Sequence, residues 1–330
     1  MNNGVQGYVH FLGFAPNPKN TFSVIQIGEH VAQFRDRQWY ASQNIFLLQP
    51  KLTETITNHH FVTASINKSL EFFSGAYNNY PTLGTLTNLI IQLPQTSDGK
   101  IDFVFMENFI RELEEERIRE LAAYLTVSGY SSYELLPAEQ KALKMFEKWE
   151  WKEYNLEKLF GKSTRGKRLK SADRIDGNLP FITAGEAETG ISAYIGNIVE
   201  IFSKNTTTID MFGSAKYRNY KYGADDHVAV VHTEKLNKHA AIFVTSAIHK
   251  SSYTGKFNYG NNFYAKDADK LNIQLPVAPD GNPDYEAMET LISAVQKLVI
   301  KDVVLYADRK IAAAKKATGR NIRRDKITED

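Results

Sequence analysis

The 330-residue sequence contains no cysteine, which excludes disulfide frameworks, thiolate metal sites and cysteine nucleophiles. It also lacks any run approaching the roughly 20 apolar residues that a membrane-spanning helix needs, and its first residues show no basic-then-apolar signal pattern. We therefore expect a protein of the cytoplasm without a membrane partner. The length favours about two domains, and with 42% hydrophobic residues the chain can bury a sizeable core.

Motifs of catalysis are missing as well. The chain has no Asn-Pro-Pro-Tyr type motif of an adenine methyltransferase, and Gly161-Lys162-Ser163 lacks the preceding glycine of a phosphate-binding loop. Pro283-Asp284 is not followed by the lysine of a nuclease site, so we interpret Asp284 as the N-cap of a helix. The eight histidines are not spaced as metal ligands. We expect no catalytic residue, metal site or cofactor in this chain.

Positive charge is low overall but locally concentrated. The formal net charge is only +2 at pH 7, so any affinity for nucleic acid has to come from clusters and not from the field of the whole protein. One cluster places five cations in the nine residues 162–170. In another, Lys216, Arg218 and Lys221 alternate with tyrosines. Both clusters are candidate DNA-binding segments.

An internal repeat is the main signal in the sequence. Ile91-Gln92-Leu93-Pro94 recurs 182 residues later as Ile273-Gln274-Leu275-Pro276, and an Asp-Gly pair follows each copy at the same distance. Phe61-Val62-Thr63 recurs as Phe243-Val244-Thr245 at the same offset, whereas Gly4 matches Gly190 at an offset of 186. This period is too long for a solenoid, so the repeat predicts a duplicated domain.

Each half is predicted to contain short strands, then a turn, then a long amphipathic helix. Strand candidates are the β-branched and aromatic runs at 21–25, 227–231 and 241–245. Proline followed by Asp98-Gly99 or Asp280-Gly281 indicates the turns. The apolar stripe of each helix either packs onto its own domain or pairs with a partner helix. The charged outer face, rich in glutamate at 112–116, favours pairing.

The ordered series of motifs in the second half resembles a known family. The resemblance is to the specificity subunits of Type I restriction-modification systems. It implies a mixed α/β (α+β) fold with two target-recognition domains of mixed sheet and short helices, each followed by a long helix, the two long helices pairing as an antiparallel coiled coil. It also implies double-stranded DNA, methyltransferase (modification) subunits and a restriction/translocation subunit as partners. The motifs are Trp151-Lys152, Leu156 to Phe160, Arg165 to Leu169, Leu179 to Ala184, Thr189 to Ile191, Leu271 to Pro276 and Asp284 to Met288.

The first half departs from this pattern at its start. Because Gly4 already corresponds to Gly190, the counterpart of residues 151–188 is missing. Three explanations stay open: a start further upstream, a shortened or silent cassette, or a compact family branch of the kind that pairs with fused nuclease-methyltransferases. The predicted domains are a first recognition domain (1–101), a first long helix (102–128), a linker with a short helix (129–150), a second recognition domain (151–282), a second long helix (283–316) and a basic tail (317–330).

Arginine, lysine, asparagine, glutamine and hydroxyl side chains are the groups that pair with base edges or contact phosphates. The alternative for any of the candidates is a solvated charged loop, and Tyr217 and Tyr220 equally fit the core of a strand pair. Asn79 matches Asn261 at the 182-residue offset, which indicates a loop present in both halves. The second-half candidates are Arg165, Lys167, Arg168, Thr183, Lys216, Tyr217, Arg218, Tyr220, Lys256, Asn258, Asn261 and Asn262, and the first-half candidates are Arg35, Arg37, Gln38, Trp39, Tyr40, Asn78 and Asn79.

The sequence thus predicts a non-catalytic DNA-specificity subunit that recognises a bipartite site. Two alternatives come from other classes. A nuclease or methyltransferase with an unfamiliar motif would act on DNA without any partner. An adaptor with duplicated domains would bind protein or carbohydrate, and its binding would be insensitive to salt, whereas phosphate neutralisation makes DNA binding fall steeply with salt.

Overall fold

The computed structural model describes residues 4–73 and 79–318. Two compact units emerge, one formed by 1–124 together with 307–330 and the other by 125–306. The predicted basic tail at 317–330 lies almost wholly outside the described residues. In the described part of the chain, no helix has the length and apolarity required to cross a membrane.

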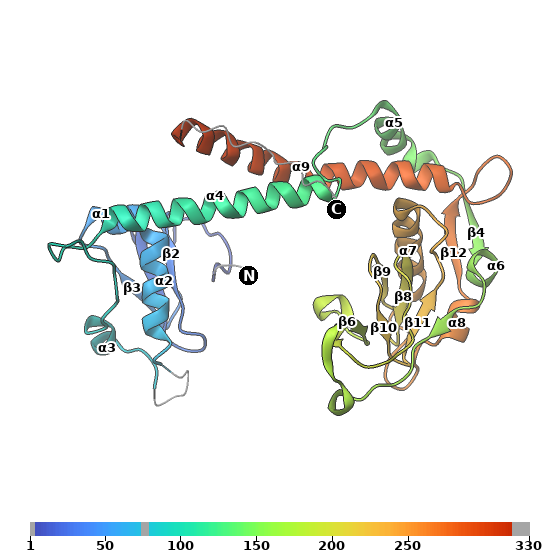
Figure 1. The fold of residues 1–330 in the computed structure, drawn as a ribbon, viewed down its shortest axis with the longest axis horizontal. Coiled ribbons are helices and arrows are strands. Elements are labelled where there is room, and N and C mark those ends of the chain that lie inside the picture. Colours follow the sequence, from blue (N-terminus) through green and yellow to red (C-terminus); the bar gives the residue numbers. More distant parts are fainter. Residues whose placement is uncertain (1–3, 74–78, 319–330) are drawn as a thin grey trace. The chain divides into compact units, whose positions relative to one another are not determined.

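The first unit is built on a three-stranded antiparallel sheet with the order β2-β1-β3. One helix, α2, lies against this sheet (Figure 1), and Val62, Ile66 and Leu70 on it pack with Phe22 and Val24 of the sheet. The elements are β1 (Thr21–Ile25), β2 (Ala32–Arg35), β3 (Ile45–Leu48), α1 (Thr53–Thr57), α2 (His59–Leu70), α3 (Leu83–Thr87) and α4 (Phe103–Val127).

The second unit contains three sheets, and helix α7 packs against two of them. Its central sheet has the order β5-β11-β8-β9, and two smaller sheets have the orders β10-β6-β7 and β12-β4. The elements are α5 (Pro137–Met145), η1 (Phe146–Lys148), β4 (Trp151–Asn155), α6 (Leu156–Phe160), β5 (Thr164–Arg165), η2 (Ser171–Asp173), β6 (Asp176–Ile182), η3 (Ala187–Gly190), β7 (Ile191–Ile195), β8 (Thr206–Asp210), β9 (Ala215–Arg218), β10 (Gly223–Ala224), β11 (Val228–Val231), α7 (Lys238–Ser252), α8 (Ala265–Asp269), β12 (Asn272–Pro276) and α9 (Tyr285–Thr318).

One predicted strand is wrong. The run 241–245 lies inside α7, whereas the predicted strands at 21–25 and 227–231 correspond to β1 and β11. Ala240, Val244 and Ile248 recur every four residues and are at most 1% exposed in the core, where a helix packed on the central sheet places them. The side chain of Asn237 caps this helix by accepting a hydrogen bond from the His239 N–H at 2.8 Å. Tertiary packing therefore overrides the β-branched local pattern.

Both turns and both long helices are confirmed. Gly99 and Gly281 have positive φ values of 79° and 82°, which the turn after each proline requires. Asp102 Oδ1 accepts the Phe105 N–H at 2.8 Å, and Asp284 Oδ1 accepts the Ala287 N–H at 2.9 Å. Asp284 is thus the predicted N-cap of α9, and Asp102 caps α4 at the equivalent position.

The start of α9 packs onto its own unit, and the end of α9 lies beside α4. Met288 and Leu291 at the start of α9 pack into the core of the second unit. In the first unit, Lys310 Nζ near the end of α9 lies 3.4 Å from Glu114 Oε2 of α4, so the last turns of α9 lie beside α4. With mixed sheets, short helices and two long helices, the chain has the mixed α/β fold class that the sequence predicts.

Candidate nucleic-acid interface

The two units contain the same sheet motif, which forms the framework of each candidate interface. β2-β1-β3 in the first unit corresponds to β9-β8-β11 in the second. The registers agree as well, because Thr21 pairs with Arg35 on β2 and Thr206 pairs with Arg218 on β9. The sequence repeat therefore corresponds to a three-stranded motif that both units share.

Backbone contacts around the sheet repeat in detail. Asn20 and Asn205 precede β1 and β8 and have positive φ values of 60° and 65°. The N–H of Asn20 donates a hydrogen bond of 2.6 Å to the carbonyl of Arg35, and that of Asn205 donates one of the same length to the carbonyl of Arg218. In both units, the helix that packs on the sheet (α2 or α7) accepts a hydrogen bond from the first residue of an outer strand (β2 or β9). Ala32 N–H donates to Asn67 Oδ1 at 2.6 Å, and Ala215 N–H donates to His249 Nδ1 at 3.1 Å. Sequence comparison missed this correspondence, since different side chains make the same bonds.

The predicted basic loop extends from β5 along the edge of the central sheet. Arg165 pairs with Ala229 of β11, and Arg165, Lys167 and Arg168 are all exposed. Gly166 between them is buried, and a Cβ atom there would lie 1.6 Å from the carbonyl oxygen of Ala224. A glycine thus lets the loop approach β10 closely, while the cations on both sides of it face solvent.

Lys216 has a different environment from these exposed cations. Its Nζ lies 2.9 Å from Ser214 Oγ, 3.2 Å from Glu186 Oε1 and 3.6 Å from Asp210 Oδ2, and its side chain is 14% exposed. Hydrogen bonds from Ser214 and Lys216 lower the pKa of the Glu186 carboxyl. Lys216 is therefore paired with protein carboxylates. Thr183, in the same β6–β7 region as Glu186, donates its N–H to Gly190 O at 2.9 Å.

The three residues 217, 218 and 220 are largely turned inward. Tyr217 donates its hydroxyl to Asn205 Oδ1 at 2.8 Å, and burial raises the pKa of this tyrosine. Arg218 is only 1% exposed and donates to Thr208 Oγ1 and to the Tyr220 hydroxyl. The prediction that Arg218 contacts DNA directly therefore conflicts with its burial, and we leave it out of the contact set proposed below.

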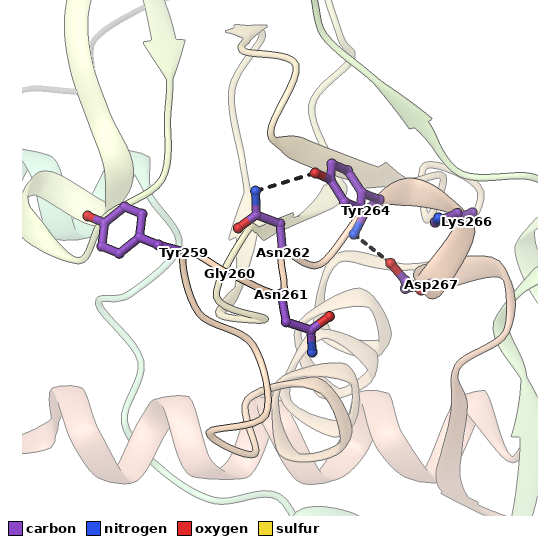
Figure 2. A pocket seen from close by; sticks show the side chains of 7 residues that line it. All are labelled: Tyr259, Gly260, Asn261, Asn262, Tyr264, Lys266 and Asp267. Carbon is purple, nitrogen blue, oxygen red and sulfur yellow. Dashed lines mark hydrogen bonds between the residues drawn. The ribbon is translucent and has the colours of Figure 1, made fainter.

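Figure 2 shows the predicted segment 256–262, a tight polar loop beside a pocket of about 260 Å³. The loop is closed by two backbone hydrogen bonds between Asn258 and Asn261, at 3.0 and 2.9 Å. Asn258, Asn261 and Lys256 are exposed, Asn262 is half-buried and donates to the Tyr264 hydroxyl at 3.4 Å, and Tyr259 is 85% exposed. An exposed aromatic ring among amides is a surface suited to nucleobases.

Five of the first-half candidates lie at the end of β2 or directly after it, at positions 35 and 37–40. Arg37 and Gln38 are exposed. Arg35 is half-buried and burial lowers its pKa, while Asn79 donates to Phe72 O at 3.3 Å. Of the two aromatic candidates, Trp39 donates to Thr21 Oγ1 and Tyr40 donates to Phe14 O, both at 3.0 Å. Asn78 lies outside the described residues.

One cluster escaped the sequence analysis. The side-chain ligand atoms of Asp225, Asp226 and His227 all lie within 4.8 Å of one another, in the turn between β10 and β11. Burial raises the pKa of the Asp225 carboxyl. The three consecutive potential ligands are visible in the sequence, but adjacent residues do not have the spacing of a metal-binding motif.

Comparisons with known proteins agree with this architecture. Residues 1–123 and 148–304 match the family described as "Type I restriction modification DNA specificity domain". A relative described as the type II restriction enzyme BgcI specificity subunit S.BcgI, from Heyndrickxia coagulans, is 25% identical over 284 residues, which cover 84% of this chain and 78% of the relative. Among solved structures, the S subunit of a Type-I restriction-modification system from M. genitalium superimposes with a TM-score of 0.54 at 15% identity, covering 92% of this chain and 82% of that one.

Proposed function

Because the chain belongs to the Type I restriction modification DNA specificity domain family, we propose that it is a non-catalytic subunit that recognises a bipartite site in double-stranded DNA. The observation that carries the proposal is the duplicated sheet motif, in which each copy is followed by a capped long helix. Two similar domains on one chain suit two half-sites with separate sequences.

In the second half, the proposed contacts are the exposed groups described above. Arg165, Lys167 and Arg168 contact phosphates or guanine edges from the basic loop, and Lys256, Asn258 and Asn261 contact bases or phosphates from the tight loop. Thr183, Lys216, Tyr217, Tyr220 and Asn262 are bonded to protein atoms and shape the surface between these loops.

In the first half, Arg37 and Gln38 are the proposed direct contacts because their side chains are exposed. Arginine and glutamine pair with guanine and adenine edges in the major groove. The proposed set contains fewer cations than that of the second half, so we expect the first half-site to contribute less to salt-dependent affinity.

The long helices are the proposed spacers and docking elements. The 25 residues of α4 extend over about 38 Å, which is close to one turn of duplex. A methyltransferase subunit bound to α4 and α9 would extrude its target base into its own site, and a restriction subunit would supply cleavage. In this proposal the chain itself needs no cofactor, and it acts in the cytoplasm, where bacterial DNA lies.

Removing one heptad from both long helices tests the spacer function. We expect the preferred distance between half-sites to change, because the helices fix it. An unchanged spacer preference in a binding assay would reject this part of the proposal.

The decisive experiment is co-expression with the neighbouring methyltransferase gene, followed by mapping of methylated positions across the host genome. A split motif with two defined halves is the expected result. A motif with one defined half would show that the first domain is inactive. No new methylation, together with salt-insensitive ligand binding, would favour the adaptor, and methylation or cleavage by the purified chain alone would contradict the non-catalytic role.

A further inference from the structure

Each half of the chain places one arginine at the end of the same strand and bonds it in the same way. Arg35 is the last residue of β2, and Arg218 is the last residue of β9. Arg35 Nε donates to Ser23 Oγ at 2.9 Å, and Arg218 Nε donates to Thr208 Oγ1 at the same distance. The hydroxyl comes from the neighbouring strand in both cases.

An aromatic ring lies beside each guanidinium. Arg35 Cζ is 5.7 Å from the ring centre of Trp39, and Arg218 Cζ is 6.0 Å from that of Tyr222, within the range of a cation–π interaction. Each ring is itself fixed by a threonine at the start of the middle strand: Trp39 Nε1 donates to Thr21 Oγ1 at 3.0 Å, and the Tyr222 and Thr206 hydroxyls are hydrogen-bonded at 2.8 Å.

A glycine completes each arginine environment. Gly4 and Gly190 have positive φ values of 63° and 87°, and a Cβ atom there would lie 3.5 Å from Arg35 Nη2 and 3.6 Å from Arg218 Nη2. The strands around these residues have diverged between the halves, from Thr-Phe-Ser-Val-Ile in β1 to Thr-Thr-Thr-Ile-Asp in β8. The set of arginine, hydroxyl, aromatic ring and glycine is therefore more constant than its surroundings.

Burial of the Arg218 guanidinium costs desolvation free energy, which implies a function for its position. It is 1% exposed, and over residues 4–73 and 79–318 no carboxylate lies within ion-pair distance of it. A buried guanidinium without a counter-ion is destabilising unless its hydrogen bonds compensate. Besides Thr208, its donors reach the Tyr220 hydroxyl at 3.1 Å and Thr189 Oγ1 at 3.5 Å.

Thr189 lies in a strained part of the β6–β7 loop. Glu188, Thr189 and Gly190 have successive positive φ values of 46°, 54° and 87°, and non-glycine residues adopt this conformation only where their surroundings enforce it. The guanidinium of Arg218 is one such constraint, because it contacts Thr189 and approaches Gly190. Thr183 and Tyr220 belong to the same set of loops.

We propose that Arg218, and Arg35 in the first half, are positioning residues that fix the DNA-recognition loops of their own half without contacting DNA. The inference rests on the proposed function and extends it to a buried arginine, Arg218, and its half-buried counterpart, Arg35. It predicts that changing either arginine relaxes sequence discrimination at one half-site and leaves the other half-site unchanged.

The test compares Arg218→Lys, Arg35→Lys and Thr208→Val with the wild-type chain in the methylation-mapping experiment. Lysine keeps the charge but loses the Nε donor and the planar fork. For Arg218→Lys we expect about a tenfold drop in the ratio of methylation at cognate sites to that at single-mismatch sites in one half of the motif. Arg35→Lys should relax the other half, so each variant is the matched control of its counterpart.

Thr208→Val separates positioning from direct contact. Thr208 is 2% exposed and cannot touch DNA, yet its loss leaves Arg218 Nε without its acceptor, so the same half of the motif should relax. If Arg218→Lys does not fold, Thr208→Val alone decides. Wild-type discrimination in Thr208→Val and Arg218→Lys would overturn the inference, as would an equal loss at both halves. Absence of any motif with the wild-type chain would instead reject the proposed function, and the inference with it.

Discussion

The segment at Ile273 and Leu275 pairs with β4 in the second half, whereas the matching segment at Ile91 and Leu93 has no strand partner among residues 4–73 and 79–318. Ile273 and Leu275 are 0% exposed, while Ile91 and Leu93 are half-buried and the adjacent Ile90 is 83% exposed. The difference follows from β4, α6 and β5 of the second half, which have no counterpart among the described residues of the first half.

The third strand of the shared three-stranded motif shows the same contrast. All four residues of β11 are buried, and β5 pairs along its edge. All four residues of β3, its counterpart, are only half-buried. The comparison teaches that the three-stranded motif and its helix have the same form in both halves, and that the sheet and the strand before the turn are more deeply buried where β4 and β5 pair with them.

The largest expected effect concerns this difference in enclosure. Leu275→Ala should lower the free energy of unfolding by about 2–5 kcal/mol, since it leaves a cavity in a closed core, while Leu93→Ala at the matching position should cost about 1 kcal/mol. Chemical denaturation followed by circular dichroism measures both. Equal losses would mean that Leu93 is as enclosed as Leu275, and the contrast between the halves would fail.

A smaller effect is expected at Gly166, the glycine that lets the basic loop approach β10 closely. The Cβ atom of Gly166→Ala would overlap the Ala224 carbonyl, at 1.6 Å from its oxygen, so the basic loop must shift, at about 1–3 kcal/mol. Gly7→Ala is the matched control in the first half, because nothing lies within 4 Å of an added Cβ there. Thermal unfolding of both variants is the measurement. A Gly166→Ala variant as stable as Gly7→Ala would show that the close approach of the basic loop to β10 does not stabilise the second half.

The two long helices differ in how they are braced. Glu139 on α5 accepts hydrogen bonds from Ser293 Oγ at 2.6 Å and Lys297 Nζ at 2.9 Å on α9. Burial acts to raise the pKa of Glu139, but hydrogen bonds from Ser293, Lys297 and the Leu136 N–H outweigh it and lower this pKa. The brace therefore stabilises the folded state above the ordinary carboxyl pKa of 4.5 and is lost as pH falls through the lowered value.

Glu139→Gln should cost about 1–3 kcal/mol at pH 7, and the difference from wild type should shrink as pH falls below 4.5, the ordinary carboxyl pKa. Glu120→Gln on α4 removes an exposed pair with Arg117 and should change stability by less than about 0.5 kcal/mol. Denaturation at several pH values tests this, and a pH-independent cost of Glu139→Gln would contradict the titration argument.

Features with a local physical cause were predictable from the sequence. The turns, the N-cap at Asp284 and the duplication follow from short motifs, and the structure confirms each. The predicted strand at 241–245 is wrong because this short β-branched run is part of α7 (Lys238–Ser252). The four-residue spacing of the apolar side chains that α7 packs into the core extends beyond the run.

The candidate contacts were harder to predict. Lys216 and Arg218 lie two residues apart on β9 and so on one face of the strand. That face is directed at protein atoms of the β6–β7 loop, which no single-sequence pattern reveals. The alternation with tyrosines fits an exposed basic strand equally well. The contact residues themselves stay a prediction.

The smallest expected effect is on the salt dependence of DNA affinity, and it distinguishes an exposed lysine of the second half from one of the first half. Lys167→Ala removes one phosphate contact, so affinity for all DNA sequences should fall together, and the slope of log affinity against log salt should become shallower by about 1. Lys68→Ala on α2 removes an equally exposed lysine, paired with Glu71, and should leave the slope unchanged. Titrations of a fluorescent duplex at several salt concentrations measure both slopes. If Lys167→Ala leaves the slope unchanged while Arg37→Ala lowers it, the first half carries the phosphate contacts, and the basic loop would be a feature of folding and not of recognition.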